Sequence, residues 1–120
     1  MFRTACTRHV DDVIFVVDVS GSVQGHRVKA IRELLVSVVA DLDVGPNATR
    51  VGAVYFSSAS HIAFKLDQYT TRQGVQQAIR RIPYTGGYSN LAAGLRTARH
   101  HLLQVSRLTQ QQAVPGITCA

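Results

Sequence analysis

The first strongly patterned segment is a run of five apolar residues, Val13 to Val17, that is interrupted by no polar position. β-branched residues dominate it, and such an unbroken run is typical of a strand covered on both faces of a parallel sheet. The pattern therefore predicts a central strand. After Gly25 the apolar residues recur every three or four positions, which predicts an amphipathic helix over residues 26–42 that packs on that sheet.

A second apolar segment, residues 50–57, completes a strand, helix, strand order. A crossover of this kind pairs its two strands in parallel within one sheet. Residues 61–66 alternate apolar and polar positions and follow after a short link. We therefore expect a third strand there, paired antiparallel to the second and lying at an edge.

Two more helices are expected in the second half of the chain. Thr70 and Gln73 have the spacing of a capping box ahead of apolar residues at helical spacing, which predicts a helix over about 71–82 that stops at Pro83. Helical spacing returns over residues 90–103, after a loop that contains glycines. The chain is thus expected to form one α/β unit of about three strands and three helices.

Length and composition agree with a single globular domain. The chain has 120 residues, of which 46% are hydrophobic and 17% charged. Its apolar runs fall far short of the roughly twenty residues of a membrane span, so we expect no span. Residues 1–12 should lead into a domain at 13–103. Residues 104–120, with a glutamine run and no periodicity, are expected to be a disordered or non-native tail.

The net charge of +6 arises late in the chain, because six arginines and no acidic residue follow Asp67. A basic segment could face phosphate groups or an acidic partner. No aromatic residues alternate with these arginines as stacking platforms, so solvated helix faces are the favoured interpretation and no nucleic-acid partner is expected. Glycine-rich loops of the dinucleotide or nucleoside-triphosphate type do not occur.

The segment most suggestive of chemistry is the turn that directly follows the first strand. It contains Asp18, Ser20 and Ser22, with Gly21 permitting a tight bend. Ligands of open parallel sheets bind at the carboxyl ends of the strands, where this turn should lie. One carboxylate and two hydroxyls are hard oxygen donors that suit Mg²⁺, Mn²⁺ or Ca²⁺. The alternative is that these residues only form a turn and cap the next helix.

A second loop adds another hydroxyl. Ser89 lies at the start of the third predicted helix, just after Gly86 and Gly87, where it could point across the same edge of the sheet. Together with the first turn, this loop favours a cation site over simple capping.

At this point the sequence resembles the von Willebrand factor type A domain, which also occurs in integrin inserted domains, matrilins and the collagen VI group. Four segments carry the resemblance in the right order and spacing, from about Asp12 to Leu103. They are Val13 to Asp18 with Ser20-Gly21-Ser22, Gly45 to Gly52, Tyr55-Phe56-Ser57, and Tyr84 to Gly87 leading to Ser89-Asn90.

The resemblance implies a Rossmann-like sheet with helices on both faces and a metal-ion-dependent adhesion site. In that family the two serines of the first motif bind the ion directly, its Asp acts mostly through water, and a Thr adds a further hydroxyl. These roles would fall to Ser20, Ser22, Asp18 and, in place of the Thr, Ser89. A carboxylate from a protein ligand, such as a matrix or collagen-like protein, would complete the coordination of Mg²⁺ or Mn²⁺. Since no bond need be made or broken, no enzyme activity is expected.

The chain departs from the family pattern after the third helix. The family continues with a strand that ends in Asp-Gly and supplies a second site carboxylate, whereas no Asp follows Asp67 here. The resemblance therefore implies an incomplete domain with weakened metal affinity. It also implies that the first strand keeps an unpaired edge, which would favour self-association.

The leading hypothesis is a divalent-metal-dependent adhesion module of a secreted matrix or cell-adhesion protein, although the chain shows no signal peptide. Asn47-Ala48-Thr49 fits the glycosylation pattern and supports the secretory route. A metal-free structural or interaction fragment is one alternative, and an intracellular type A domain in a multiprotein complex is another. Cys6 and Cys119 do not decide the compartment.

Overall fold

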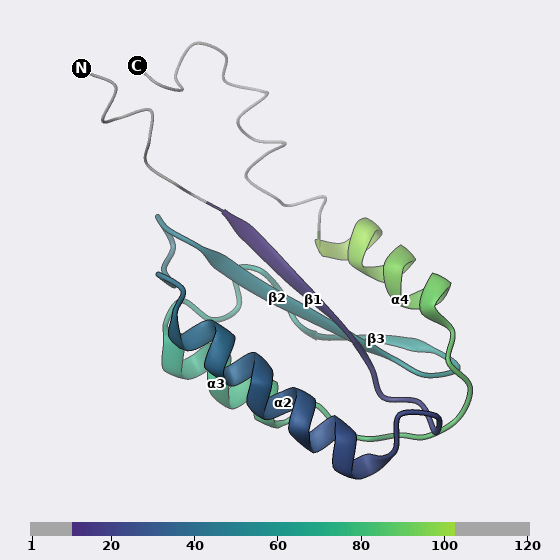
Figure 1. Ribbon diagram of the computed structural model, residues 1–120. Helices are drawn as coiled ribbons and strands as arrows, with labels where there is room; N and C mark the ends of the chain where they lie inside the picture. Colours follow the sequence, from purple (N-terminus) through teal and green to yellow (C-terminus); the bar gives the residue numbers. More distant parts are fainter. Residues whose placement is uncertain (1–10, 103–120) are drawn as a thin grey trace, which may run out of the picture.

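The computed structural model describes residues 11–102 (Figure 1). The predicted tail at 104–120 and nearly all of the lead-in at 1–12 lie outside these residues. The described elements are β1 (Asp12–Asp18), α2 (Gly25–Ala40), β2 (Arg50–Phe56), β3 (Ser60–Phe64), α3 (Arg72–Arg80), α4 (Leu91–Thr97) and η1, a π-helical turn (Ala98–Leu102). All three predicted strands and all three predicted helices are therefore present, with ends that differ by a few residues.

The strands form one mixed sheet in the order β1-β2-β3. β1 and β2 pair in parallel from Asp12 opposite Arg50 to Asp18 opposite Phe56. β2 and β3 pair antiparallel, with an irregularity between Ala53 and Val54. Figure 1 shows α2 and α3 side by side on one face of the sheet and α4 on the other. The predicted α/β class, the strand directions and the helices on both faces are confirmed.

Each face of the sheet has its own apolar core. The larger core lies between the sheet and the pair α2 and α3, and it includes the buried side chains Val28, Val39, Phe64, Val75 and Ile79. The smaller core joins Val54 of β2 to Ala98, with partly buried side chains packed around them. Residues of β1 contribute to both cores, which explains why that strand needs apolar side chains at successive positions.

β1 lies at the edge of the described sheet, so the central position predicted from its apolar run is wrong for residues 11–102, whereas the unpaired edge that the family resemblance implied is present there. Of its apolar residues only Val17 is fully buried, and Val13 to Val16 keep partial exposure. The pattern correctly reported apolar cover on both faces. It could not predict whether another strand pairs with β1 in the sheet, because strand pairing is made by backbone hydrogen bonds and does not depend on side-chain type.

Capping residues determine where the two later helices begin. The hydroxyl of Thr71 accepts from the backbone N–H of Gly74, so the cap of α3 is Thr71 and the predicted capping box on Thr70 is wrong. At α4 the side chain of Asn90 accepts from the N–H of Ala93. Ser89 therefore lies directly before this cap, two residues ahead of the start of α4. None of the helices within residues 11–102 is long and apolar enough to cross a bilayer.

Candidate metal centre

The candidate site forms where β1 and β2 end at the same edge of the sheet. The backbone N–H of Val19 donates to the carbonyl of Phe56 over 2.9 Å, so pairing continues one residue beyond β1. Because the two strands are parallel, the turn after β1 and the loop after β2 leave the sheet together.

The turn after β1 is organised around Asp18. Its Oδ1 accepts from the backbone N–H of Ser20 at 2.9 Å. The hydroxyls of Ser20 and Ser22 lie 3.0 Å apart and share a hydrogen bond. Ser20 is completely buried, whereas Ser22 is exposed. The turn thus buries the side chain of Ser20 and exposes that of Ser22 to solvent.

Backbone hydrogen bonds attach the glycine loop to this turn. The N–H of Gly86 donates to the carbonyl of Val19 at 3.0 Å, and the N–H of Gly21 donates to the carbonyl of Gly87 at 2.9 Å. Gly86 and Gly87 have φ of 73° and 88°, a region in which side chains are strained. The double glycine is therefore required for the chain to turn back against residues 19–21.

This contact brings together residues that lie far apart in the sequence. The hydroxyl of Ser89 donates to Oδ2 of Asp18 at 2.8 Å, although 71 positions separate them. The N–H of the next residue, Asn90, donates to the carbonyl of Ser57 at 2.9 Å and anchors the loop to the end of β2. All four candidate residues, Asp18, Ser20, Ser22 and Ser89, thus belong to one hydrogen-bonded cluster.

The cluster keeps Asp18 ionised. Burial raises the pKa of Asp18, but hydrogen bonding from the side chain and backbone of Ser20 and from the hydroxyl of Ser89 outweighs it, so the pKa lies below the ordinary value of 3.8. A carboxylate that is charged at neutral pH is what a cation requires.

The donor set fits a hard divalent cation. One carboxylate and three hydroxyls come from two loops, and oxygen donors of this type suit Mg²⁺ and Mn²⁺. Residues 11–102 contain no group of three or more His, Cys, Asp or Glu side chains placed to hold a metal, which is the arrangement that zinc would prefer.

Two residues of this region escaped assignment from the sequence. The hydroxyl of Thr85 donates to that of Ser57 at 2.9 Å, and Ser57 is buried at the end of β2. This hydrogen bond attaches the glycine loop to the end of β2. The signal that could have found Ser57 is its position after the second parallel strand, at the edge where ligands of such sheets bind.

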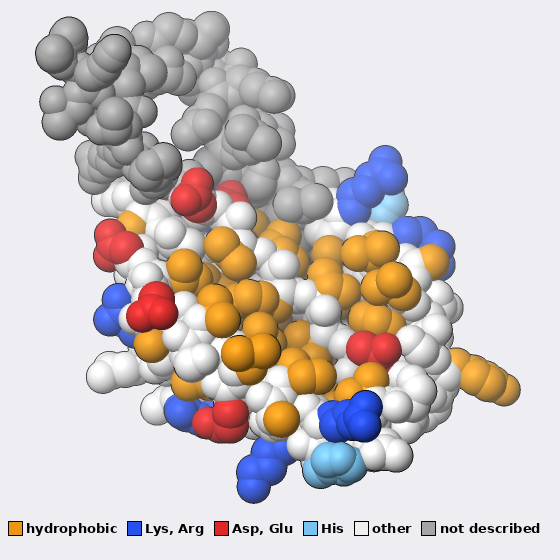
Figure 2. Space-filling view, viewed as in Figure 1, with side chains coloured by type: hydrophobic (Ala, Val, Ile, Leu, Met, Phe, Trp, Pro, Cys, Tyr) orange, Lys and Arg blue, Asp and Glu red, His pale blue; other side chains and the backbone are white. Residues whose placement is uncertain are grey.

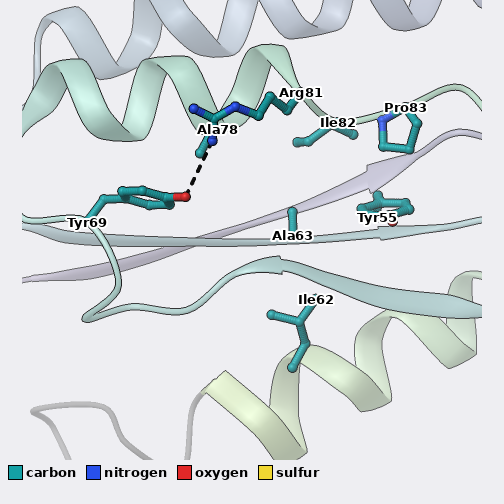
Figure 3. A pocket seen from close by; sticks show the side chains of 8 residues that line it. All are labelled: Tyr55, Ile62, Ala63, Tyr69, Ala78, Arg81, Ile82 and Pro83. Carbon is teal, nitrogen blue, oxygen red and sulfur yellow. Dashed lines mark hydrogen bonds between the residues drawn. The ribbon is translucent and has the colours of Figure 1, made fainter.

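A cavity of the described structure lies away from this cluster. It has a volume of about 160 Å³ and lies between the sheet and the end of α3, where Tyr69 and Arg81 share a hydrogen bond of 3.5 Å (Figure 3). Its lining contains neither acidic residues nor any of the four candidate residues. Figure 3 also shows Ile62 pointing away from the other labelled side chains, toward the opposite face of the sheet.

The predicted glycosylation residue, Asn47, is exposed in the loop between α2 and β2. Thr49, the third residue of the motif, is nearly buried, and its N–H donates to the carbonyl of Asp43. The side chain that would carry the glycan is thus accessible, while the loop itself is held in place.

Comparison with known proteins accounts for this arrangement. The sequence profile of the von Willebrand factor type A domain matches residues 12–115. The chain belongs to the von Willebrand factor type A domain family. Its relatives include von Willebrand factor A domain-containing protein 1 of Mus musculus, 35% identical over 91 residues, and matrilin-1 of Homo sapiens, 39% identical over 89 residues.

This type A chain spans a small part of those relatives. The alignments cover 76% of the chain and 22% of the mouse protein, and 72% of the chain and 18% of human matrilin-1. A solved structure with the same fold is proximal thread matrix protein 1 from the mussel byssus, with a TM-score of 0.75, 22% identity, and coverage of 82% of this chain and 26% of that one. Another structure of the mussel protein has a MIDAS motif, a metal-ion-dependent adhesion site, occupied by zinc. Its TM-score is 0.73 at 21% identity, and the match covers 85% of this chain and 27% of that one.

Proposed function

We propose that this type A chain is a divalent-metal-dependent adhesion module. Asp18, Ser20, Ser22 and Ser89 would hold Mg²⁺ or Mn²⁺, and an Asp or Glu carboxylate of a protein ligand would complete the coordination. The observation that carries the proposal is the hydrogen bond from Ser89 to Asp18, because it shows two distant loops presenting oxygen donors to one place.

The charge of the donor set explains why such a site would bind a carboxylate. Asp18 is the one carboxylate in the cluster, and the other three donors are neutral hydroxyls. A bound divalent cation would therefore keep a net positive charge at the surface of the protein. An acidic side chain from a partner would neutralise that charge and contribute a hard oxygen ligand, which makes the cation the point of attachment.

The relatives support a partner and a location outside the cell. They include matrilin-1, and the mussel protein of the same fold is a thread matrix protein whose MIDAS motif has been seen with a metal. The exposure of Asn47 is compatible with a glycan added along the secretory route. We infer that the ligand is a protein of the matrix, such as a collagen-like protein that carries Glu or Asp side chains.

The metal affinity is expected to be weak. Within residues 68–120 the sequence has no Asp or Glu, so the glycine loop and the helix after it bring no second carboxylate to Asp18. Affinity of hard-cation sites rises with the number of charged ligands. The site should therefore bind Mg²⁺ or Mn²⁺ less tightly than a site with two carboxylates.

One observation favours a second function, that of a metal-free interaction fragment. Both carboxylate oxygens of Asp18 already accept hydrogen bonds, from Ser20 and from Ser89. The carboxylate of Asp18 thus has hydrogen-bond partners without a cation. The turn and the glycine loop would therefore stay together in the absence of metal. In this case partner binding would not respond to metal.

The test is a calorimetric titration of the full chain with Mn²⁺ and with Mg²⁺, followed by binding to a collagen-like peptide that carries glutamate. We expect saturable Mn²⁺ binding that is lost in Asp18→Ala and Ser22→Ala. Asp43→Asn is the matched control, since it removes a negative charge from an exposed side chain away from the cluster. Peptide binding should require the metal and disappear in EDTA.

The outcomes separate the two functions. Peptide binding that is equal with Mn²⁺ and with EDTA would overturn the adhesion mechanism and favour the metal-free fragment. Mn²⁺ binding that persists in Asp18→Ala but falls in Asp43→Asn would place the metal elsewhere in the chain.

A further inference from the structure

The cavity between β3 and the end of α3 lies toward the edge of the sheet opposite to β1 (Figure 3). β2 lies between β1 and β3, so a strand that paired with β1 would leave this cavity open. Figure 2 shows apolar side chains gathered along β1, between α2 and α4, and the cavity is separate from that surface. Its accessibility therefore does not depend on what covers β1.

Two alanines leave room for the cavity. Ala63 of β3 and Ala78 of α3 both line it. The register between β2 and β3 shifts at this point, and Ala63 has no partner residue in β2. Such bulges are frequent at sheet edges and beside functional sites. Because each alanine side chain ends at Cβ, a space of about 160 Å³ stays between the strand and the helix.

Tyrosine rings line the cavity and are held by other rings. Tyr55 stacks on His61 with their ring centres 5.1 Å apart. Tyr69 contacts the buried ring of Phe64 edge-on at 5.7 Å. Both tyrosines are half-buried, so part of each ring is open to a ligand. Since these rings are already oriented, binding would cost little ordering of side chains.

Arg81 gives the cavity a positive charge without a counter-ion. It is exposed, lines the cavity, and donates to the hydroxyl of Tyr69 at 3.5 Å. No carboxylate within residues 11–102 forms an ion pair with Arg81, whereas the neighbouring Arg80 lies 3.8 Å from Glu33. The lining contains no acidic residue. The charge therefore favours a ligand that brings its own carboxylate.

The volume of the cavity favours one side chain over a whole metabolite. Pockets for drug-sized molecules measure roughly 300–1,000 Å³, whereas a cavity of about 150 Å³ can hold a single benzene ring. Tyrosine rings and a guanidinium also attract an aromatic ring through edge-to-face and cation–π contacts, which an aliphatic side chain cannot make.

We propose that this cavity binds an aromatic side chain in an acidic segment of a partner protein. A phenylalanine ring of the partner packs against Tyr55 and Tyr69, above the two alanines. A Glu or Asp next to that phenylalanine pairs with Arg81. None of the four residues of the metal cluster lines the cavity, so this binding needs no cation and does not rest on the adhesion function.

The test is an NMR titration of the full chain with the capped peptide Gly-Glu-Phe-Glu-Gly. EDTA is present throughout, so that no metal can bind the glutamates. We expect saturable binding that shifts the methyl signals of Ala63 and Ala78. Replacing Phe by Ala in the peptide should weaken binding at least about tenfold, because the ring supplies most of the buried area. Replacing both Glu by Gln should weaken it about two- to fivefold, as expected for an exposed ion pair.

Variants of the chain test each part of the site. Arg81→Gln should weaken binding of the glutamate peptide about two- to fivefold and leave the glutamine peptide unaffected. Arg80→Gln is the matched control, since it removes the same charge from the adjacent exposed residue, which does not line the cavity. Ala78→Leu should fill the cavity and abolish binding. Ala63→Leu fills it from the half-buried strand, and thermal unfolding shows that each variant is folded.

Several results would contradict the proposal. They are no binding in EDTA, equal binding of the Phe and Ala peptides, equal binding of a Leu peptide, and equal losses in Arg80→Gln and Arg81→Gln. A folded Ala63→Leu variant that binds as the wild type would place the peptide elsewhere and overturn the site. Peptide binding that occurs with Mn²⁺ but not with EDTA would count against this cavity and in favour of the metal cluster, so the two functions can fail separately.

Discussion

Gly94 of α4 packs directly over the ring of Phe56, the last residue of β2. A Cβ added to Gly94 would lie 2.7 Å from Cδ1 of Phe56 and 3.0 Å from its Cγ, closer than carbon atoms can approach. The lack of a side chain at Gly94 therefore determines how near α4 lies to the sheet. Because Ser89 precedes this helix by two residues, the same packing helps to place it beside Asp18.

Gly94→Ala should destabilise the fold despite the better helix propensity of alanine. Overpacking of a filled site costs about 1–3 kcal/mol, which exceeds the gain of up to about 1 kcal/mol from replacing glycine in a helix. Urea unfolding of the wild type and the variant measures the difference. In a Phe56→Ala background the added methyl group has room, so Gly94→Ala should there be neutral or stabilising. A Gly94→Ala variant that is more stable in the wild-type background would contradict this packing.

Ser89→Ala should lower the affinity for Mn²⁺ by roughly ten- to a hundredfold, since it removes a hydroxyl that bonds to a charged group in the cluster. Calorimetry or electron paramagnetic resonance of Mn²⁺ would measure the change. Ser58→Ala is the control, because Ser58 is an exposed serine of the loop that follows β2. Equal affinities in the two variants would show that Ser89 contributes nothing to metal binding.

The pKa of Asp18 in the metal-free protein is expected below 3.8, because hydrogen bonds from Ser20 and Ser89 outweigh the effect of burial. Since the folded-state pKa is the lower one, this carboxylate stabilises the fold above the unfolded pKa, and its contribution is lost as the pH falls through the folded pKa. Carboxyl NMR titration in EDTA checks the midpoint. Ser89→Ala should raise it, and an unchanged midpoint would mean that the hydrogen bond is absent in solution.

Thr85→Val should loosen the glycine loop. The substitution keeps the shape of the side chain but removes the donor to Ser57, whose buried hydroxyl then loses a partner at a cost of about 1–3 kcal/mol. Thermal unfolding measures the loss, and exchange of the Gly86 amide, which bonds to Val19, should accelerate. Thr85→Ser retains the hydroxyl and should behave as the wild type, so a stable Thr85→Val variant would argue against this anchoring.

Asn47 should carry a glycan when the chain is produced through a secretory pathway. Its side chain is exposed, and the motif lies in a surface loop. Mass spectrometry before and after removal of N-linked glycans would detect it, and Asn47→Gln should abolish the mass difference. Full-length secreted protein without this modification would remove the support that the motif gives to an extracellular location.

The sequence by itself determined the elements and their pairing. The unbroken apolar run at Val13 to Val17 and the helical spacing after Gly25 follow from side-chain periodicity, which reports which faces of a segment are buried. The strand, helix, strand order then left a parallel pair as the allowed arrangement, and that pair is β1 and β2. The turn at Asp18 could be assigned to the ligand-binding edge for the same reason.

Only the tertiary structure decided which groups meet. The approach of Ser89 to Asp18 depends on the positive φ of Gly86 and Gly87, on the anchoring of the loop to β2, and on the closeness of α4 at Gly94. The edge position of β1 likewise depends on which strand takes which neighbour. Both depend on backbone groups and on contacts between residues far apart in the chain. Side-chain periodicity could not predict them, because it indicates which faces of a segment are buried and not which other segment packs against those faces.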